Sequence, residues 1–365
     1  MTLIPQNSLG ARTAERLKTM IADGLWTGWL PGERSLSRTL QVGHATLRAA
    51  LAQLRHEGVV ESHHGVGNRI VALPESAGTS LPLPASVGLL IPETVRHLRP
   101  FSLWLDDFRD HLIQAGWRLK LYADARHYRA GPDKSLQRLV AQNHHDCWVL
   151  VLSSPAMQHW FETSGPPCIL AGSCHGGINL PSVDVDHRAV SRHAAGVLLR
   201  AGHRHLALFN PSSRHAGDQQ TEIGFFEGIR QSPHADSATA SVSYHDIDAD
   251  SIEKCLQRMF NTPHPQRPTA LLISNAYAYL TALSFLAARG LRVPQDVSLI
   301  SRDDDPFLDY LRPTPARYLN QPDAFARKLV SQVLAAPARL PVESRHLRLL
   351  PKFFAGHSIG APPPV

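Results

Sequence analysis

The sequence has 365 residues, of which 43% are hydrophobic and 19% are charged. This length exceeds one ordinary domain core, and this composition excludes an intrinsically disordered chain. The formal net charge of +6 is compatible with a polyanionic partner but does not identify one.

The sequence shows no targeting or membrane segment. Its first ten residues lack the basic start and apolar core of a signal peptide, and no run approaches the ~20 apolar residues that cross a bilayer. The cysteines are widely spaced and form no C-x-x-C pair, at Cys147, Cys168, Cys174 and Cys255. That spacing argues against a zinc site or a disulfide framework. We therefore expect a cytoplasmic protein with no membrane partner and no bound metal.

Three helices are predicted near the N-terminus. They cover residues 11–23, 33–40 and 44–56. In the third helix Leu47, Leu51 and Leu54 recur at helical spacing and form a face to be buried. Two short strands at 59–62 and 68–71 then flank a glycine-containing loop, which predicts a hairpin.

Helix, helix, turn, helix and hairpin is the order of a winged helix-turn-helix. In such a module the third helix enters the major groove with its N-terminus first, which brings backbone N–H groups and side chains to phosphates and base edges. The hairpin tip, with its glycine, can approach the DNA backbone closely.

The matching residues resemble the GntR family of bacterial regulators. They are the segments Leu30-Pro-Gly-Glu-Arg34, Val42-Gly-His-Ala-Thr-Leu-Arg48-Ala-Ala-Leu51 and His64-Gly65. The resemblance implies DNA contacts from Arg34, Thr46, Arg48, His64 and Gly65. The family usually has Ser-Arg where this chain has Gly43-His44, so we expect His44 to replace an arginine as a weaker phosphate partner.

A linker is predicted after this module, because residues 73–86 are rich in proline and small polar side chains. The expected organisation is a DNA-binding domain at 1–72, the linker at 73–86, a ligand-sensing domain at 87–355 and a flexible tail at 356–365. The tail ends in Ala-Pro-Pro-Pro-Val.

The large domain alternates short apolar runs with helical patterns. Strands are predicted at 87–91, 117–122, 147–152, 168–171, 205–209, 241–244, 270–273 and 297–300, with helices between them, one of them at 101–115. This alternation predicts α/β architecture with parallel sheets covered on both faces. Ligands in such folds bind beyond the carboxyl ends of the strands.

Several blocks of the large domain resemble the LacI-type sensor domain. They lie at 184–190, 194–208, 224–228, 268–275 and 288–300, followed by Asp303-Asp304. The resemblance implies the periplasmic-binding-protein fold, with two α/β lobes and a ligand cleft between them.

The resemblance also implies effector contacts. In relatives, residues at the positions of Asn275 and Asp303 hydrogen-bond a sugar or a nucleobase, and Thr221 stands where an arginine commonly joins them. Ser153, which follows the third predicted strand, is a further candidate. This chain has Ala276 and Arg302 where relatives have an aspartate and an aromatic residue, which points to an unusual effector.

These features predict a transcription regulator whose binding to double-stranded operator DNA is controlled by a small molecule, such as a sugar or related metabolite. We expect a homodimer that reads two half-sites. Two alternatives stay open: a solute-binding protein, and a pyridoxal-phosphate enzyme fused to a winged helix module. The lysines of the large domain do not stand in the Ser-x-x-Lys-like context that such an enzyme needs, and no nucleophile, base and oxyanion donors are recognised. We therefore predict no enzyme and no cofactor.

Overall fold

The computed structural model describes residues 9–22, 26, 28–40, 42–63, 67–71, 84–93, 99–129, 131–261, 267–337 and 345–364. The chain divides into two compact units, residues 1–83 and 84–365. Most of the predicted linker at 73–86 lies outside the described residues, and Ser86 already begins a strand.

The N-terminal unit is the predicted winged helix-turn-helix. Its elements are α1 (Leu9–Ala22), α2 (Glu33–Leu40), α3 (His44–His56), β1 (Val60–His63) and β2 (Gly67–Ile70). The two strands pair in antiparallel fashion, with Val60 opposite Ile70. Leucines from all three helices are buried together, including Leu17, Leu36 and Leu47. This small apolar core fixes the helix order that the sequence predicted.

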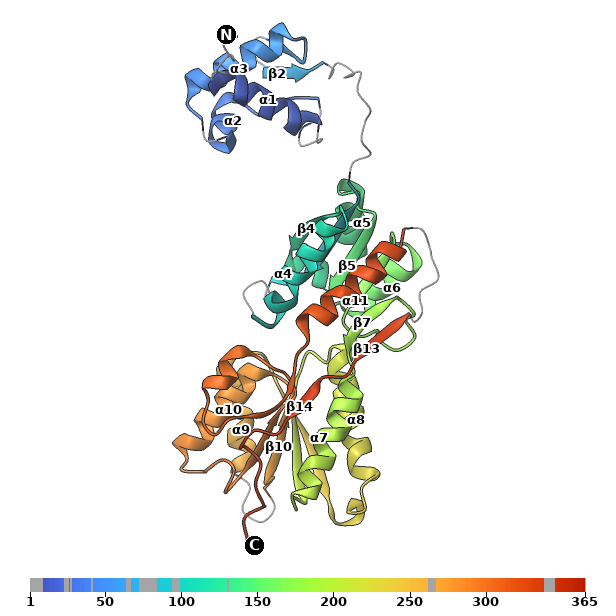
Figure 1. Cartoon of the computed structure of the whole chain (residues 1–365), viewed down its shortest axis with the longest axis vertical. Coiled ribbons are helices and arrows are strands. Elements are labelled where there is room, and N and C mark those ends of the chain that lie inside the picture. The colour runs from blue at the N-terminus through green and yellow to red at the C-terminus, as the bar shows by residue number, and fades with distance from the viewer. Residues whose placement is uncertain are drawn as a thin grey trace, which may run out of the picture. The chain divides into compact units, whose positions relative to one another are not determined.

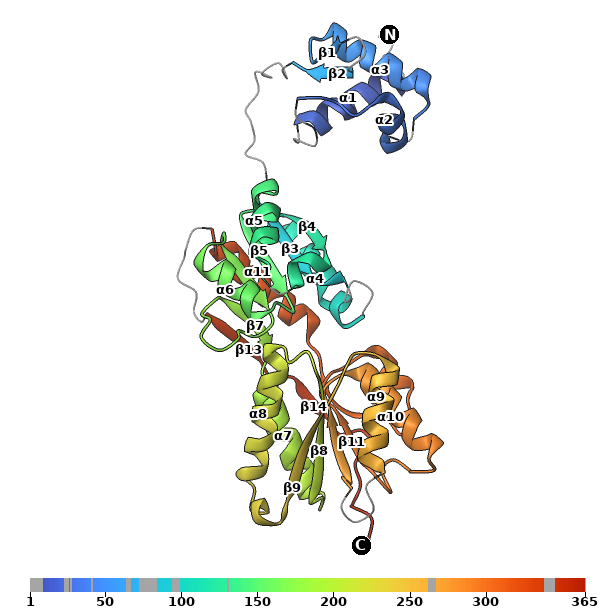
Figure 2. The same cartoon turned by 180° about the vertical axis from the view of Figure 1, so that it is seen from behind.

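The first lobe of the larger unit comprises residues 84–185 and 322–349. Its elements are β3 (Ser86–Ile91), α4 (Arg99–Gln114), β4 (Arg118–Ala123), η2 (Ala125–Tyr128), α5 (Asp133–Gln142), β5 (Cys147–Val151), α6 (Pro155–Thr163), β6 (Cys168–Ala171), β7 (Ser182–Val185), α11 (Pro322–Ala335) and β13 (His346–Leu349). The strands form one parallel sheet in the order β13-β7-β6-β5-β3-β4. Helices α4 and α11 cover one face, and α5 and α6 cover the other (Figures 1 and 2).

The second lobe comprises residues 187–319 and 352–364. Its elements are α7 (His187–Arg200), β8 (His205–Pro211), α8 (Ala216–Arg230), η3 (Ala235–Ser237), β9 (Thr239–His245), α9 (Ala249–Phe260), β10 (Ala270–Ile273), α10 (Ala276–Ala288), β11 (Ser298–Ser301), η4 (Pro306–Tyr310), β12 (Ala316–Leu319) and β14 (Lys352–Phe354). The sheet order is β14-β12-β11-β10-β8-β9, with only β14 antiparallel to its neighbour. Helices α7 and α8 cover one face, and α9 and α10 cover the other.

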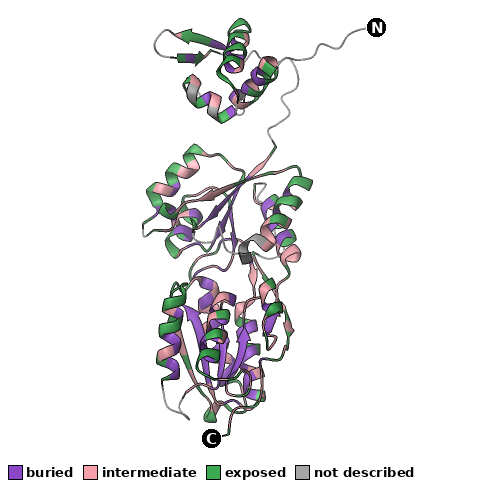
Figure 3. Cartoon of the chain, turned by 90° about the vertical axis from the view of Figure 1, so that its left-hand side faces the viewer, coloured by how far each residue is buried: buried purple, intermediate pink, exposed green. Residues whose placement is uncertain are grey.

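Both sheets are buried, which accounts for the nearly continuous apolar runs of their central strands (Figure 3). The chain crosses between the lobes at three places: after β7, after β12 and after β13. As a result, each lobe contains segments that are distant in sequence, and the connections lie together. None of the described helices is both long and apolar enough to cross a membrane.

The C-terminal segment differs from the flexible tail that we expected at 356–365. Ser358 is fully buried, and its Oγ donates to the carbonyl of Leu299 (2.6 Å) and accepts from the amide of Ala316 (2.8 Å). The carbonyl of Gly360 lies 3.0 Å from Nε2 of the buried His203. The segment is ordered because it satisfies backbone and imidazole groups that the second lobe would otherwise bury without partners.

Candidate functional site

Helix α3 has one buried face and one outward face. Leu47, Leu51 and Leu54 are buried, whereas His44 and Arg48 are exposed and Thr46 is half-buried. Gly43 is the N-cap residue and provides no side-chain cap, as its lack of a side chain requires. The first turn of α3 therefore keeps its backbone N–H groups available to an anion.

Arg48 is held by a neighbouring helix. Its Nε donates to Oε2 of Glu33 (3.2 Å), the first residue of α2. The arginine side chain is 73% exposed, so this ion pair is weak and can be exchanged for a phosphate or a base edge. Arg34 follows Glu33 in α2, and its side chain lies outside the described part of the structure.

The base of the hairpin is braced by Trp29. This residue forms a β-bridge to Arg69 of β2, and its ring meets His63 edge-on at a centroid distance of 5.3 Å. The predicted contacts His64 and Gly65 belong to the hairpin tip and lie outside the described residues. The described strands nevertheless direct a hairpin connection beside the outward face of β1 and β2.

A cavity of about 320 Å³ lies between the two lobes of the large unit. Its lining includes the carboxyl ends of strands from both sheets, among them Val151, Ala171, Val185, Pro211, Ser274, Arg302, Asn320 and Leu349. This is the position where α/β folds bind ligands, as the sequence predicted. The cavity also touches all three connections between the lobes.

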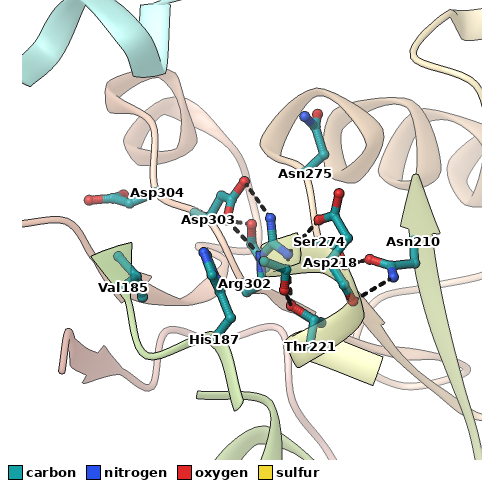
Figure 4. Close-up of polar contacts among 12 residues, drawn as sticks. Val185, His187, Asn210, Asp218, Thr221, Ser274, Asn275, Arg302, Asp303 and Asp304 are labelled. Atoms are coloured by element: carbon teal, nitrogen blue, oxygen red, sulfur yellow. Dashed lines mark hydrogen bonds and ion pairs between the residues drawn. The ribbon is translucent and has the colours of Figure 1, made fainter. Parts of the chain in front are cut away.

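A buried ionic cluster forms the floor of this cavity on the second lobe. Arg302 donates from Nε and Nη2 to the two carboxylate oxygens of Asp303, at 2.9 and 3.3 Å. Its Nη1 donates to Oδ1 of Asp218 (2.9 Å) and to Oγ1 of Thr221 (2.8 Å) (Figure 4). Burial opposes the charge of Arg302, but the two aspartates outweigh it and raise the pKa of the guanidinium.

Asn275 and Asp303, both predicted effector contacts, line the cavity. Asn275 is also the N-cap of α10, because its Oδ1 accepts from the amides of Tyr277 (2.8 Å) and Ala278 (3.1 Å). Its side chain thus has a structural role as well as a position in the cleft. Asp303 accepts from Arg302 with both oxygens and is 30% exposed.

The other two predicted effector contacts do not line the cavity. Thr221 is fully buried, donates to the carbonyl of Gly217 and accepts from Arg302. Ser153 is buried and accepts from Nε2 of Gln158 (3.0 Å). Their hydroxyl groups are engaged by the protein interior, so we no longer assign either residue a direct effector contact.

The first lobe contributes one carboxylate to the cavity. Asp184 of β7 accepts from Ser173 (2.6 Å) and lies 3.3 Å from Nε2 of His187. Burial alone would raise the pKa of Asp184, but the His187 imidazole and the Ser173 hydroxyl lower it below the ordinary value. Gly217 lets α8 pass this pair closely, since a Cβ there would lie 2.8 Å from the His187 ring.

Strained backbone occurs on both sides of the cavity. Leu152 and Arg214 have φ angles of 47° and 48°, in the left-handed region that residues other than glycine rarely adopt. Leu152 lines the cavity, and Arg214 precedes the lining residue His215. Strained residues cluster at ligand sites, which supports the cavity as a binding site.

Several cavity residues were not identified from the sequence. Asp218 could have been found, because it lies in the first turn of the helix that follows β8. The aromatic side chains Trp104, Tyr277 and Phe325 belong to helices, where the sequence pattern marks them only as apolar. Within the described ranges, no cluster of His, Cys, Asp or Glu is suited to hold a metal ion.

Two family models match the sequence. Residues 9–70 match the model for bacterial regulatory proteins of the gntR family. Residues 195–359 match the model for a periplasmic binding protein-like domain. The two matches fall in the two separate units of the structure.

Among curated proteins, the chain is 28% identical over 149 residues to a probable HTH-type transcriptional repressor, ExuR, of Bacillus subtilis (37% of this chain, 44% of the relative). It is 28% identical over 144 residues to the repressor PurR of Aliivibrio fischeri (38% of this chain, 40% of the relative). The chain therefore matches less than half the length of these relatives.

Solved structures resemble the large unit. The transcription regulator CcpA of Lactococcus lactis superposes with a TM-score of 0.66 at 18% identity, over 76% of this chain and 99% of that one. A LacI family regulator of Enterococcus faecium, solved with bound ribose, gives a TM-score of 0.59 at 18% identity, over 75% and 98% of the two chains. At this identity the likeness concerns the fold.

Proposed function

We propose that this chain, which joins a GntR-type winged helix-turn-helix domain to a LacI-type periplasmic-binding-protein-like domain, is a transcription regulator that binds operator DNA under the control of a small-molecule effector. The observation that carries the proposal is the outward face of α3. His44, Thr46 and Arg48 lie opposite the buried leucines of this helix. The named relatives are transcriptional repressors, which favours repression and gives no support to the enzyme or transport alternatives.

In this proposal α3 enters the major groove with its N-terminus first. The uncapped N–H groups after Gly43 bind a phosphate, and His44 adds a second, weaker phosphate contact. Arg48 leaves Glu33 and joins Thr46 at base edges, where a bidentate arginine recognises guanine. Arg34, His64 and Gly65 complete the contacts to the DNA backbone.

Effector control uses the cleft between the lobes. An effector that contacts residues of both lobes and of their connections binds one relative orientation of the lobes better than another, and so shifts their equilibrium. Asn275 and Asp303 contact it from the second lobe. In a homodimer such a shift changes the spacing of two DNA-binding domains, which must match two half-sites about 34 Å apart or a multiple of that distance.

The test of DNA binding is selection of fragments from the native genome by the purified full chain at near-physiological salt. We expect the wild type to enrich a palindromic site. Arg48→Ala should abolish the enrichment and reduce the slope of log affinity against log salt by about one if a phosphate contact is also lost.

Arg55→Ala is the matched control, because Arg55 is also exposed on α3 but lies two turns further from the N-terminus. It should retain the site. Equal enrichment by wild type and a folded Arg48→Ala variant would refute the recognition role of Arg48. Failure of the wild type to enrich any site, with or without added cell extract as a source of effector, would refute the proposed function.

A further inference from the structure

The cavity between the lobes is acidic in an otherwise basic chain. Among the described residues that line it, the charged side chains are Asp184, Asp218, Asp303 and Arg302. Three carboxylates and one guanidinium give a formal charge of −2, whereas the whole chain has +6. Even when His187 beside Asp184 is protonated, an excess of negative charge stays at the cavity.

The single arginine at this cavity is already engaged. Four hydrogen bonds from its five N–H groups go to Asp303, Asp218 and Thr221. A carboxylate or phosphate on the effector would have to displace these internal partners. Arg302 is therefore poorly available to bind an anion, and its role is to fix the positions of the two aspartates.

Asp218 has an acceptor left over. Its Oδ1 accepts from Arg302, while no described protein group donates to its Oδ2. Figure 4 shows one carboxylate oxygen of Asp218 directed to Arg302 and the other directed away from it, on the side of Asn275. The side chain is only 10% exposed, so a donor that reaches Oδ2 would meet a carboxylate shielded from water.

The remaining charge balance also favours a cation. Burial lowers the pKa of His215, against the opposing effect of Asp218, so this imidazole is neutral at neutral pH. When the lobes close over the cavity, water that solvates the carboxylates is excluded, and a neutral ligand leaves their charge uncompensated. A cationic ligand supplies the compensation.

The opposite wall of the cavity is apolar and partly aromatic. Trp104 and Phe325 of the first lobe lie with ring centroids 5.2 Å apart, and Tyr277 lines the cavity from the second lobe. Aliphatic side chains extend this wall, from Leu103, Val151, Leu152, Ile247 and Leu349. Such a surface binds a hydrocarbon or aromatic body, and aromatic rings also attract organic cations.

We propose that the effector is a small organic cation, in which a protonated amine binds Oδ2 of Asp218 and an apolar or aromatic body packs against Trp104 and Phe325. The inference rests on the proposed function, since it takes the cleft as the effector site. It distinguishes this cleft from one built for uncharged sugars or for acids, because its single cation is engaged and its open acceptor is charged.

The test compares three probes that share a phenylethyl body and differ in charge: phenethylamine, 2-phenylethanol and 3-phenylpropanoate. Binding to the full chain is measured by titration calorimetry. We expect millimolar or tighter binding of the amine, with a Kd at least about tenfold below that of the alcohol, and the weakest binding for the acid. Asp218→Asn should bring amine and alcohol within about twofold of each other.

Asp250→Asn is the matched control, because Asp250 is exposed in α9 and outside the cavity lining; it should leave the preference unchanged. Tighter or equal binding of the alcohol or the acid, or no binding of the amine at about 10 mM, would overturn the proposal. The wild-type series decides the matter alone if the Asp218 variant does not fold. A neutral molecule that binds the cleft and releases the operator would overturn the cation while sustaining the proposed function.

Discussion

The two lobes have sheets of the same strand number and nearly the same order, but they treat polar groups differently at the cleft. The second lobe places a buried ionic cluster there, Arg302 with Asp218 and Asp303. The first lobe places mainly apolar side chains there, such as Trp104 and Phe325. The comparison shows how one fold, used twice, can supply a fixed polar floor and an apolar cover to the same cavity.

At the opposite edge of the sheets the lobes are alike. In the first lobe His145, just before β5, lies 2.9 Å from Oγ of Ser86 at the start of β3. In the second lobe His203, just before β8, lies 2.9 Å from Oγ of Ser298 at the start of β11. A buried imidazole ties neighbouring strands together in each case. The lobes therefore share their structural edge and differ at the edge that binds ligand.

The largest expected effect is the loss of the cation from the polar floor. Arg302→Met leaves Asp218 and Asp303 without their partner in a largely buried position, and we expect it to lower the free energy of unfolding by about 4 kcal/mol. Urea denaturation of the full chain measures this change. Neutralising both acids as well, with Asp218→Asn and Asp303→Asn, should restore much of the loss.

The control for that prediction is Arg292→Met, which removes an arginine that is 71% exposed and paired with Asp296. It should cost less than about 1 kcal/mol. If Arg302→Met costs no more than this control, the cluster does not stabilise the second lobe and the contrast between the lobes loses its energetic basis.

The next effect concerns the C-terminal segment, which completes only the second lobe. Removal of residues 357–365 deletes Ser358 and so leaves the amides of Leu299 and Ala316 without their partners. We expect a loss of about 3 kcal/mol in the free energy of unfolding. Removal of residues 361–365 keeps Ser358 and Gly360 and should cost less than about 1 kcal/mol. Similar losses from both truncations would contradict the assigned contacts.

Helix packing in the second lobe gives a smaller effect. A Cβ at Gly224 of α8 would lie 2.1 Å from the carbonyl oxygen of Arg188 in α7, so Gly224→Ala must separate the two helices and should cost about 2 kcal/mol. At Gly196 of α7 the nearest atom is the mobile end of Arg200, at 3.2 Å. Gly196→Ala should be neutral or stabilise by up to about 1 kcal/mol. Thermal unfolding of both variants tests this, and equal destabilisation would contradict it.

The sequence predicted much of the fold because periodicity reports burial directly. The ranges of α2 and α3 agree with the structure, and most central strands agree within one or two residues. The strands β7, β12, β13 and β14 were not predicted. Each has only three or four residues, and β13 and β14 alternate partly buried with exposed positions, so they lack the apolar run that identifies a central strand.

The cavity was harder to predict than the sheets. Its position beyond the strand ends followed from the fold, and Asn275 and Asp303 were located there correctly by resemblance. The partners of Arg302 could not be predicted, because Asp218 and Thr221 lie more than eighty residues earlier and meet it only through the pairing of the strands. For the same reason Thr221 was expected at the ligand, although its hydroxyl serves Arg302.

The smallest expected effect tests the structural edge that the lobes share. Burial, with help from the charge of Lys120, lowers the pKa of His145 to about 4 from an ordinary value of about 6.5. Above pH 6.5 both folded and unfolded states hold this imidazole neutral. Between pH 6.5 and 4 the unfolded state binds a proton that the folded state does not, so His145 makes the protein less stable as the pH falls.

His145→Gln should therefore cost about 1 kcal/mol at pH 7, through the lost hydrogen bonds to Ser86 and Tyr122, and should reduce the stability lost between pH 7 and pH 5. His144→Gln is the control, since His144 is the exposed neighbour. Urea denaturation at the two pH values separates the cases. An unchanged pH dependence in His145→Gln would mean that this imidazole is protonated in the folded lobe, and its pairing with Ser86 would then be that of a charged donor rather than the neutral tie that His203 makes in the second lobe.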